Sequence, residues 1–227
     1  MPVILSLETS TDVCSVALHA GEKLLAEAVL QEPQSHASRL APLIQEVIAR
    51  SGKDLKDLRA IAISSGPGSY TGLRIGTSTA KGMCYALEIP LIAIGTLELL
   101  AFQGKALNPS GALLCPMIDA RRMEVYSLLA GPDLEIIEPV AARVIDHESF
   151  AETLKDNRVL FFGNGAKKCE GIIKHPNAFF VDDVFPRASA LGVLAKKKFS
   201  SGDFEDLVHF KPFYLKEFEV KKPRAGA

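Results

Sequence analysis

The chain has 227 residues, of which 48% are apolar, and its 26 Lys and Arg nearly balance its 27 Asp and Glu. This apolar fraction is enough for a sizeable core and excludes wholesale disorder. The net charge of −1 argues against a protein that binds nucleic acid mainly through electrostatic attraction, so any contact with nucleic acid would be local or made by a partner.

The first half of the chain predicts three strands followed by alternating helices and strands. The strands are expected at 3–5, 13–19, 23–30, 60–64 and 91–94. Helices are expected over about 35–50 and 71–87, and a short one starts near residue 96. Leu40, Leu43, Ile44 and Val47 recur at helical spacing in the first of these helices, which is therefore amphipathic.

The second half repeats this order after a linker at 104–111. Its strands are predicted at 113–118, 124–130, 135–143 and 159–162, and its helices at 147–155, 166–174 and 188–200. Two copies of a mixed sheet with helices predict an α/β protein with the duplicated ribonuclease-H-like fold of actin, sugar kinases and chaperone ATPases. We expect an N-terminal lobe over 1–105 and a C-terminal lobe over 106–227, whose last helix and tail are free to pack back on the first lobe.

The first candidate site is the turn after the first strand, where Glu8 is followed by the hydroxyls of Thr9 and Ser10. In nucleotide-binding members of this fold the hairpin approaches phosphate. Here the glycine that would admit phosphate to the backbone amides is absent, and a polar turn explains the residues as well. We keep Glu8, Thr9, Ser10 and, in the second copy, Asp119 as candidates for nucleotide contact, and we predict no catalytic residue and no bound cofactor.

The second candidate is the glycine-rich loop SSGPGSYTGLRIG at 64–76, between a buried strand and a helix. Gly66 and Gly68 permit positive φ and close backbone approach, and Thr71 is predicted as the N-cap of a helix whose free amides can hold an anion. The spacing matches neither the dinucleotide fingerprint nor the P-loop. We therefore interpret this motif, which also includes Arg74, as a tight turn whose helix start faces a partner.

Small residues follow the loop on one face of the helix. Gly72, Gly76 and Ala80 recur at i, i+4 spacing and allow close approach of another element. Glycine inside a helix costs about 0.5–1 kcal/mol relative to alanine, so close packing has to offset this cost. The packing partner can belong to the same domain or to a second subunit, and the sequence leaves both open.

No arrangement of metal ligands or nucleophiles is recognisable. The five histidines include no i, i+4 helical pair, and no nucleophile elbow GxSxG occurs. The four scattered cysteines form no CxxC pair, which predicts buried free thiols in a reducing compartment. With no signal-peptide pattern and no apolar run near the roughly 20 residues of a membrane span, we expect a soluble cytoplasmic protein.

Four segments resemble the TsaB (YeaZ) family, in order and spacing, along nearly the whole chain. They are LSLETST at 5–11, AISSGPGSYTGLRIG at 62–76, DARRMEVY at 119–126 and KPFYLKEFEVKKPR at 211–224. The resemblance implies a role in making threonylcarbamoyladenosine beside the tRNA anticodon. It also implies TsaD, the related transferase, as the binding partner, TsaE as an ATPase that joins them, and TsaC as the source of the activated donor.

The resemblance implies a supporting role rather than catalysis. TsaD carries two metal-binding histidines at i, i+4 after a strand, and matching by eye places them at Thr96 and Leu100, which cannot replace a histidine at a metal. The resemblance further implies an interface formed by the two helices of the first lobe. We expect an apolar stripe of Leu40, Leu43, Ile44 and Val47 there, with close approach at Gly72, Gly76 and Ala80, and a homodimer through the same surface when TsaD is absent.

Two other hypotheses remain open. The chain can be an enzyme, a nucleotide-dependent hydrolase or kinase of the same fold, in which Glu8 and Asp119 would act. The aromatic and basic tail, residues 210–224, can bind tRNA directly, although an aromatic segment docked on the body with a solvated basic end explains it more simply. Calorimetry with ATP and magnesium would test the first, and deletion of 219–227 the second.

Overall fold

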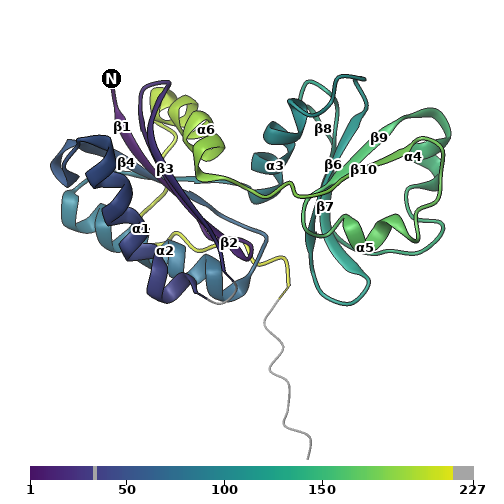
Figure 1. The fold of residues 1–227 in the computed structure, drawn as a ribbon, viewed down its shortest axis with the longest axis horizontal. Helices are drawn as coiled ribbons and strands as arrows, with labels where there is room; N and C mark the ends of the chain where they lie inside the picture. The colour runs from purple at the N-terminus through teal and green to yellow at the C-terminus, as the bar shows by residue number, and fades with distance from the viewer. Residues whose placement is uncertain (33–34, 217–227) are drawn as a thin grey trace, which may run out of the picture.

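The structure is a computed structural model that describes residues 1–32 and 35–216 and contains two five-stranded sheets (Figure 1). The first sheet consists of β1 (Val3–Glu8), β2 (Val13–Ala20), β3 (Lys23–Gln31), β4 (Leu58–Ser64) and β5 (Leu91–Ile94). The second consists of β6 (Leu113–Asp119), β7 (Glu124–Ala130), β8 (Ile136–Val144), β9 (Val159–Phe162) and β10 (Ala178–Val181).

The two sheets have the same topology. Their strand orders are β3-β2-β1-β4-β5 and β8-β7-β6-β9-β10, and in each the first three strands are antiparallel and the last two run parallel to the first. This match confirms the predicted duplicated ribonuclease-H-like fold. Strand β10, which completes the second copy, was not predicted, because four residues that are only partly buried give no usable periodicity.

Helices separate and cover the two sheets. They are α1 (His36–Ser51), α2 (Tyr70–Leu87), α3 (Thr96–Lys105), α4 (Ala151–Asp156), α5 (Lys167–Glu170) and α6 (Ala188–Ser201), with a 3-10 turn at Leu55–Asp57. In Figure 1, α1 and α2 lie side by side on one face of the first sheet and α6 lies on its other face. Helix α3 packs between α6 and the second sheet, and α4 and α5 cover the far face of that sheet.

Each sheet is buried on both faces, which is why its central strands are almost continuously apolar. In β1, Leu5 and Leu7 point into the core under α1 and α2, whereas Ile4 points into the core under α6. In the second sheet, Leu114 packs beneath α3 and Cys115 packs on the side of α4 and α5. All four cysteines are free and buried, as predicted.

Two helices of the second lobe are shorter than predicted. The Asp146 side chain accepts hydrogen bonds from the Glu148 amide at 3.0 Å and from the Ser149 hydroxyl at 2.8 Å, and this local turn delays α4 until residue 151. Helix α5 ends at Glu170 instead of continuing to residue 174. The N-cap of α2 is Ser69, whose hydroxyl accepts from the Gly72 amide at 3.3 Å, so the prediction of Thr71 was wrong.

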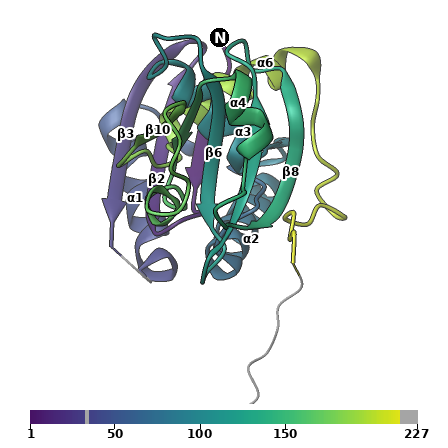
Figure 2. The ribbon, with the colours of Figure 1, turned by 90° about the vertical axis from the view of Figure 1, so that its right-hand side faces the viewer.

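The chain returns to the first lobe at α6 and continues along that lobe beyond the end of the helix. Residues 203–216, which we call the strap, form the yellow segment that descends from the end of α6 in Figure 2. No helix within 1–32 and 35–216 is both long enough and apolar enough to span a membrane.

Candidate functional site

Glu8, at the carboxyl end of β1, is fully buried and hydrogen-bonded within the chain. Its Oε1 accepts from the Ser10 amide at 2.6 Å and from the Ser10 hydroxyl at 2.5 Å, and its Oε2 accepts from the Ser64 hydroxyl. Burial raises the pKa of this carboxyl to about 7, although the hydrogen bonds from Ser10 lower it in part. The side chain thus joins the turn after β1 to the end of β4.

The glycine-rich loop covers the turn beside this carboxylate. The Ser69 amide donates to the Ser10 carbonyl at 2.7 Å, and the Thr9 hydroxyl donates to the Gly72 carbonyl at 2.9 Å. A Cβ at Gly68 would lie 2.3 Å from the Ser10 carbonyl oxygen, and one at Gly72 would lie 2.1 Å from that of Thr9. Backbone from the loop therefore packs directly against this hairpin and leaves no room for a side chain at Gly68 or Gly72.

The small residues of α2 face this same hairpin. A Cβ at Gly76 would lie 2.3 Å from the Thr9 hydroxyl oxygen, and Ala80 is fully buried in the core of the first lobe. The prediction that Gly72, Gly76 and Ala80 admit a partner helix was therefore wrong. The alternative that the sequence left open, packing within the domain, is what the structure has.

The apolar stripe of α1 also faces inward. Leu40, Leu43, Ile44 and Val47 are each 7% exposed or less, in the core between α1 and the first sheet. Their assignment to the partner surface was wrong because a single apolar stripe on a surface helix packs first against its own sheet. An Asp at position 43 or 47 would place a carboxylate in this core and unfold the lobe, so it would not report on partner binding.

The exposed positions of α1 and α2 include a set of short side chains and one aromatic residue, besides the charged Arg39, Glu46, Arg50 and Arg74. Around Gly82 the space is open, since a Cβ there would meet nothing within 4 Å, and Tyr85 is 80% exposed one turn further along. We call this surface the helix-pair face. It comprises Ala41, Gln45 and Ala49 of α1 and Ser78, Gly82 and Tyr85 of α2, all of them exposed.

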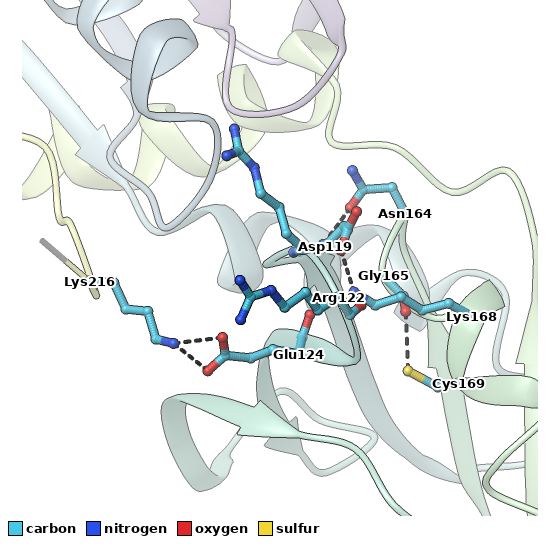
Figure 3. Close-up of polar contacts among 9 residues, drawn as sticks. Asp119, Arg122, Glu124, Asn164, Gly165, Lys168, Cys169 and Lys216 are labelled. Atoms are coloured by element: carbon cyan, nitrogen blue, oxygen red, sulfur yellow. Dashed lines mark hydrogen bonds and ion pairs between the residues drawn. The ribbon is translucent and has the colours of Figure 1, made fainter. Parts of the chain in front are cut away.

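Asp119 ends β6, at the position corresponding to Glu8 in the first sheet, and belongs to a polar cluster (Figure 3). Its Oδ1 pairs with Nζ of Lys168, and its amide donates to Oδ1 of Asn164 at 3.1 Å. The same Nζ donates to the carbonyl oxygens of Arg122 at 2.8 Å and of residue 124 at 2.7 Å. Lys168 therefore closes the turn between β6 and β7 and balances the charge of the carboxylate.

The residues predicted to contact nucleotide differ in their access to solvent. Glu8, Thr9 and Ser10 are at most 3% exposed and are hydrogen-bonded to the chain itself, so their side chains are not accessible to a ligand in this structure. Asp119 is exposed, but one of its oxygens is held by Lys168. It stays a candidate.

The positions matched to the histidines of the transferase are both buried. Thr96 begins α3, and Leu100 lies in the core that α3 shares with the second sheet. Across the described residues, 1–32 and 35–216, no three His, Cys, Asp or Glu side chains gather as metal ligands would. A cavity of about 590 Å³ lies elsewhere between the lobes, and its lining combines apolar residues with the charged Glu98, Lys198, Glu205 and Lys211. Its lining includes Gly66, Ala93, Leu128, Val140, Phe210 and Phe213.

The remaining loop and tail predictions fall on identifiable contacts. The Arg74 guanidinium lies 4.1 Å from the centroid of the Tyr70 ring, on the exposed side of α2. Residues 210–216 of the tail dock on the body, whereas 217–227, which include the basic end proposed to bind tRNA, lie outside the described residues. The sequence reasoning missed the helix-pair face. The exposed positions 78, 82 and 85, opposite the small-residue face, could have indicated it.

Comparisons with known proteins agree with this fold over nearly the whole chain. The family model described as TsaD, tRNA N6-adenosine threonylcarbamoyltransferase, matches residues 23–222. The tRNA threonylcarbamoyladenosine biosynthesis protein TsaB of Escherichia coli is 31% identical over 231 residues, which cover 98% of this chain and 98% of that protein.

Solved structures that superpose on this chain have the same fold. YeaZ from Pseudomonas aeruginosa superposes with a TM-score of 0.82 at 27% identity, covering 95% of this chain and 100% of that one. An activator of 2-hydroxyisocaproyl-CoA dehydratase from Clostridium difficile, solved with ADPNP, has a TM-score of 0.51 at 8% identity and shares the fold alone. The chain belongs to the family of the TsaD transferases and, within it, to the TsaB (YeaZ) proteins.

Proposed function

We propose that the chain is a non-catalytic subunit that binds a TsaD transferase and supports it during threonylcarbamoylation of the tRNA adenosine beside the anticodon. One observation carries the proposal. The hairpin that approaches phosphate in nucleotide-binding members of the fold is packed directly against the chain's own glycine loop, with Gly68 and Gly72 against the Ser10 and Thr9 carbonyls. A chain with this packing keeps the shape of the transferase family without that phosphate site.

The helix-pair face is the surface we assign to the partner. Because the chain matches the transferase family over residues 23–222, the partner shares the same two helices, and the two proteins can pair about an approximate two-fold axis. The open space at Gly82 admits a helix closely, and the exposed Tyr85 is the type of side chain that anchors interfaces. A stable complex would bury about 1,600 Å² in total.

The other components follow from this role. TsaE would join the pair as the ATPase, TsaC would supply the activated threonylcarbamoyl donor, and tRNA would be held mainly by the transferase. The near-neutral net charge of −1 fits indirect rather than direct tRNA contact. In the absence of the transferase, a second copy of the chain can occupy the same face as a homodimer.

A reconstitution experiment tests the proposal. The chain is purified alone and together with the TsaD of its own organism, and each preparation is assayed for tRNA modification with TsaC, TsaE, ATP and threonine. We expect a stable complex, modification only when TsaD is present, and a lower rate when this chain is left out. Modification by this chain without TsaD, or ATP turnover by the isolated chain in calorimetry with magnesium, would favour the enzyme hypothesis instead.

A matched pair of variants tests the surface. Gly82→Arg adds a long charged side chain to the centre of the helix-pair face, where the fold has room for it. Ser200→Arg makes the same addition at an exposed position of α6, on the other side of the first sheet. We expect Gly82→Arg to weaken TsaD binding about 100-fold or more and Ser200→Arg to leave it unchanged, with both circular dichroism spectra native. Wild-type affinity in Gly82→Arg would remove the helix-pair face from consideration.

A further inference from the structure

The strap is attached to the edge of the first sheet and to the middle of α2. The Glu205 amide donates to the Leu91 carbonyl at 2.9 Å, as in an added strand beside β5. Nζ of Lys81, on α2, donates to the carbonyl oxygens of Val208 and Phe210, each at 3.2 Å. These bonds hold backbone, so they fix the path of the strap along α2 toward the start of that helix.

The strap then packs on the outer side of the glycine loop. The Phe213 amide donates to the Ser65 carbonyl at 2.7 Å, and a Cβ at Gly66 would lie 2.5 Å from the Phe213 carbonyl oxygen. The rings of Tyr214 and Tyr70, the first residue of α2, are 4.9 Å apart. The loop is thus enclosed by the β1–β2 hairpin on its inner side and by the strap on its outer side.

The strap ends on the second lobe. Nζ of Lys216 lies 2.6 Å from both carboxylate oxygens of Glu124, the first residue of β7 (Figure 3). The Glu124 side chain is only 19% exposed, so this pair is less screened than a fully exposed one. Segments 8–11, 64–76, 119–126 and 211–216, far apart in sequence, are therefore joined in one chain of contacts across both lobes.

We propose that the strap is a positioning element that couples the second lobe to the glycine loop and the first turn of α2, and thereby keeps the helix-pair face in its partner-binding arrangement. That the strap holds the glycine loop in place follows from the contacts of Phe213 and Tyr214 alone. The effect on partner binding rests in addition on the proposed function. Tyr214 acts through Tyr70, and Lys216 acts through Glu124, so both are positioning residues and need not touch the partner.

Hydrogen–deuterium exchange of the full chain and its variants tests the holding of the loop. Tyr214→Ala removes the ring contact with α2, and a chain that ends after Lys211 removes the last part of the strap. The matched control ends after Lys216 and lacks only 217–227. We expect amides of residues 66–73 to exchange about three- to tenfold faster in the first two, because an aromatic pair contributes about that factor to a local opening equilibrium. Amides of α1 and the control should exchange as in the wild type.

A charge reversal tests the coupling between the lobes. Lys216→Glu places like charges together and should accelerate exchange of residues 66–73, whereas the double variant Lys216→Glu with Glu124→Lys should restore protection. If the strap were docked only on the first lobe, a change at Glu124 in the second lobe would not restore the protection of residues 66–73. Equal exchange in the single and double variants would overturn the coupling.

TsaD affinity, measured on the same proteins, separates the two proposals. If the wild-type chain binds TsaD and Tyr214→Ala binds it about three- to tenfold more weakly, the positioning role is supported. If the loop exchanges faster but affinity is unchanged, the strap has no role in partner binding. If Tyr214→Ala and the chain ending after Lys211 both exchange like the wild type, the strap does not hold the loop. Failure of the wild-type chain to bind TsaD would sink the proposed function and leave the exchange result standing.

Discussion

At the scale of single residues, Glu8 is a carboxyl group that the fold removes fully from water. Three hydrogen bonds surround the carboxyl group, yet burial dominates and raises its pKa from 4.5 to about 7. A protonated Glu8 can itself donate to the Ser64 hydroxyl oxygen. The group therefore serves the packing of β1, β4 and the intervening turn best when it carries a proton.

This raised pKa predicts a specific dependence of stability on pH. Between pH 4.5 and 7 the unfolded chain loses the Glu8 proton while the folded chain keeps it, so Glu8 makes the protein less stable as pH rises through that window. The stabilisation is complete below pH 4.5, and about 3 kcal/mol of it is lost above pH 7. Glu8→Gln, which cannot ionise, should gain stability relative to the wild type by that order of magnitude between pH 5 and 8.

Urea unfolding of both proteins at pH 5, 6, 7 and 8 measures the effect. Comparing the variant with the wild type at each pH cancels the other titrating groups. The difference in the free energy of unfolding should grow in favour of Glu8→Gln as pH rises from 5 to 7 and level off toward pH 8. A difference that does not vary with pH would mean that Glu8 titrates near its ordinary pKa in the folded protein.

The sequence predicts the positions of Glu8 and Asp119 in the fold but not their burial or their bonding partners. The sequence singles out Glu8 and Asp119 as acidic residues that end the central strands of two repeats, and the structure places them at equivalent positions. It does not tell that one is buried by the glycine loop while the other is paired with Lys168. Both differences arise from segments more than 40 residues away, which local patterns do not encode.

At the scale of elements, two of the three glycines of α2 lie in opposite environments. Gly76 touches the Thr9 side chain, whereas Gly82 faces open space. Gly76→Ala should destabilise the protein by about 1–3 kcal/mol, because the added methyl overpacks a filled interface. Gly82→Ala should stabilise it by up to about 1 kcal/mol through helix propensity alone.

Thermal unfolding of the two variants provides the comparison, and each serves as the other's control for the exchange of Gly for Ala in one helix. The melting temperature should fall for Gly76→Ala and stay equal or rise for Gly82→Ala. If both variants fell by the same amount, the contact between Thr9 and Gly76 would not be what requires glycine. TsaD binding of Gly82→Ala adds a second reading, since the methyl group enters the centre of the helix-pair face.

The helices α1 and α2 also show why the position of a helix in the sequence is easier to predict than the structure it packs against. Periodicity identified α1 and α2 nearly to their ends and identified the stripe of Leu40, Leu43, Ile44 and Val47. Periodicity does not show whether the stripe packs against a sheet of the same chain or against a partner, because both contacts require the same apolar spacing. The first sheet is always present at contact distance, so it takes the stripe, and only the exposed side chains on the outer sides of α1 and α2 remain for the partner that we propose.

At the scale of the whole molecule, the two sheets exchange helices. Helix α3, from the first half of the chain, buries Leu97 and Leu100 in the core of the second sheet. Helix α6, from the second half, buries Leu191 and Ala195 against the first sheet. The division at residue 105 that the sequence predicts separates the strands of the two sheets but cuts through this exchange. Neither half of the chain can bury its own apolar surface without the other.

This exchange predicts that the lobes remain together after the connection between them is cut. With a protease site inserted between Pro109 and Ser110, an exposed position, the cleaved protein should elute from a sizing column as one particle and unfold in urea in a single transition. Fragment 1–105 alone should stay unfolded, because Ile4, Ala60 and Ile92 would lose the cover of α6. Expressed with 106–227, it should regain native circular dichroism. Two separate particles after cleavage would show instead that each lobe holds its fold without the helix of the other.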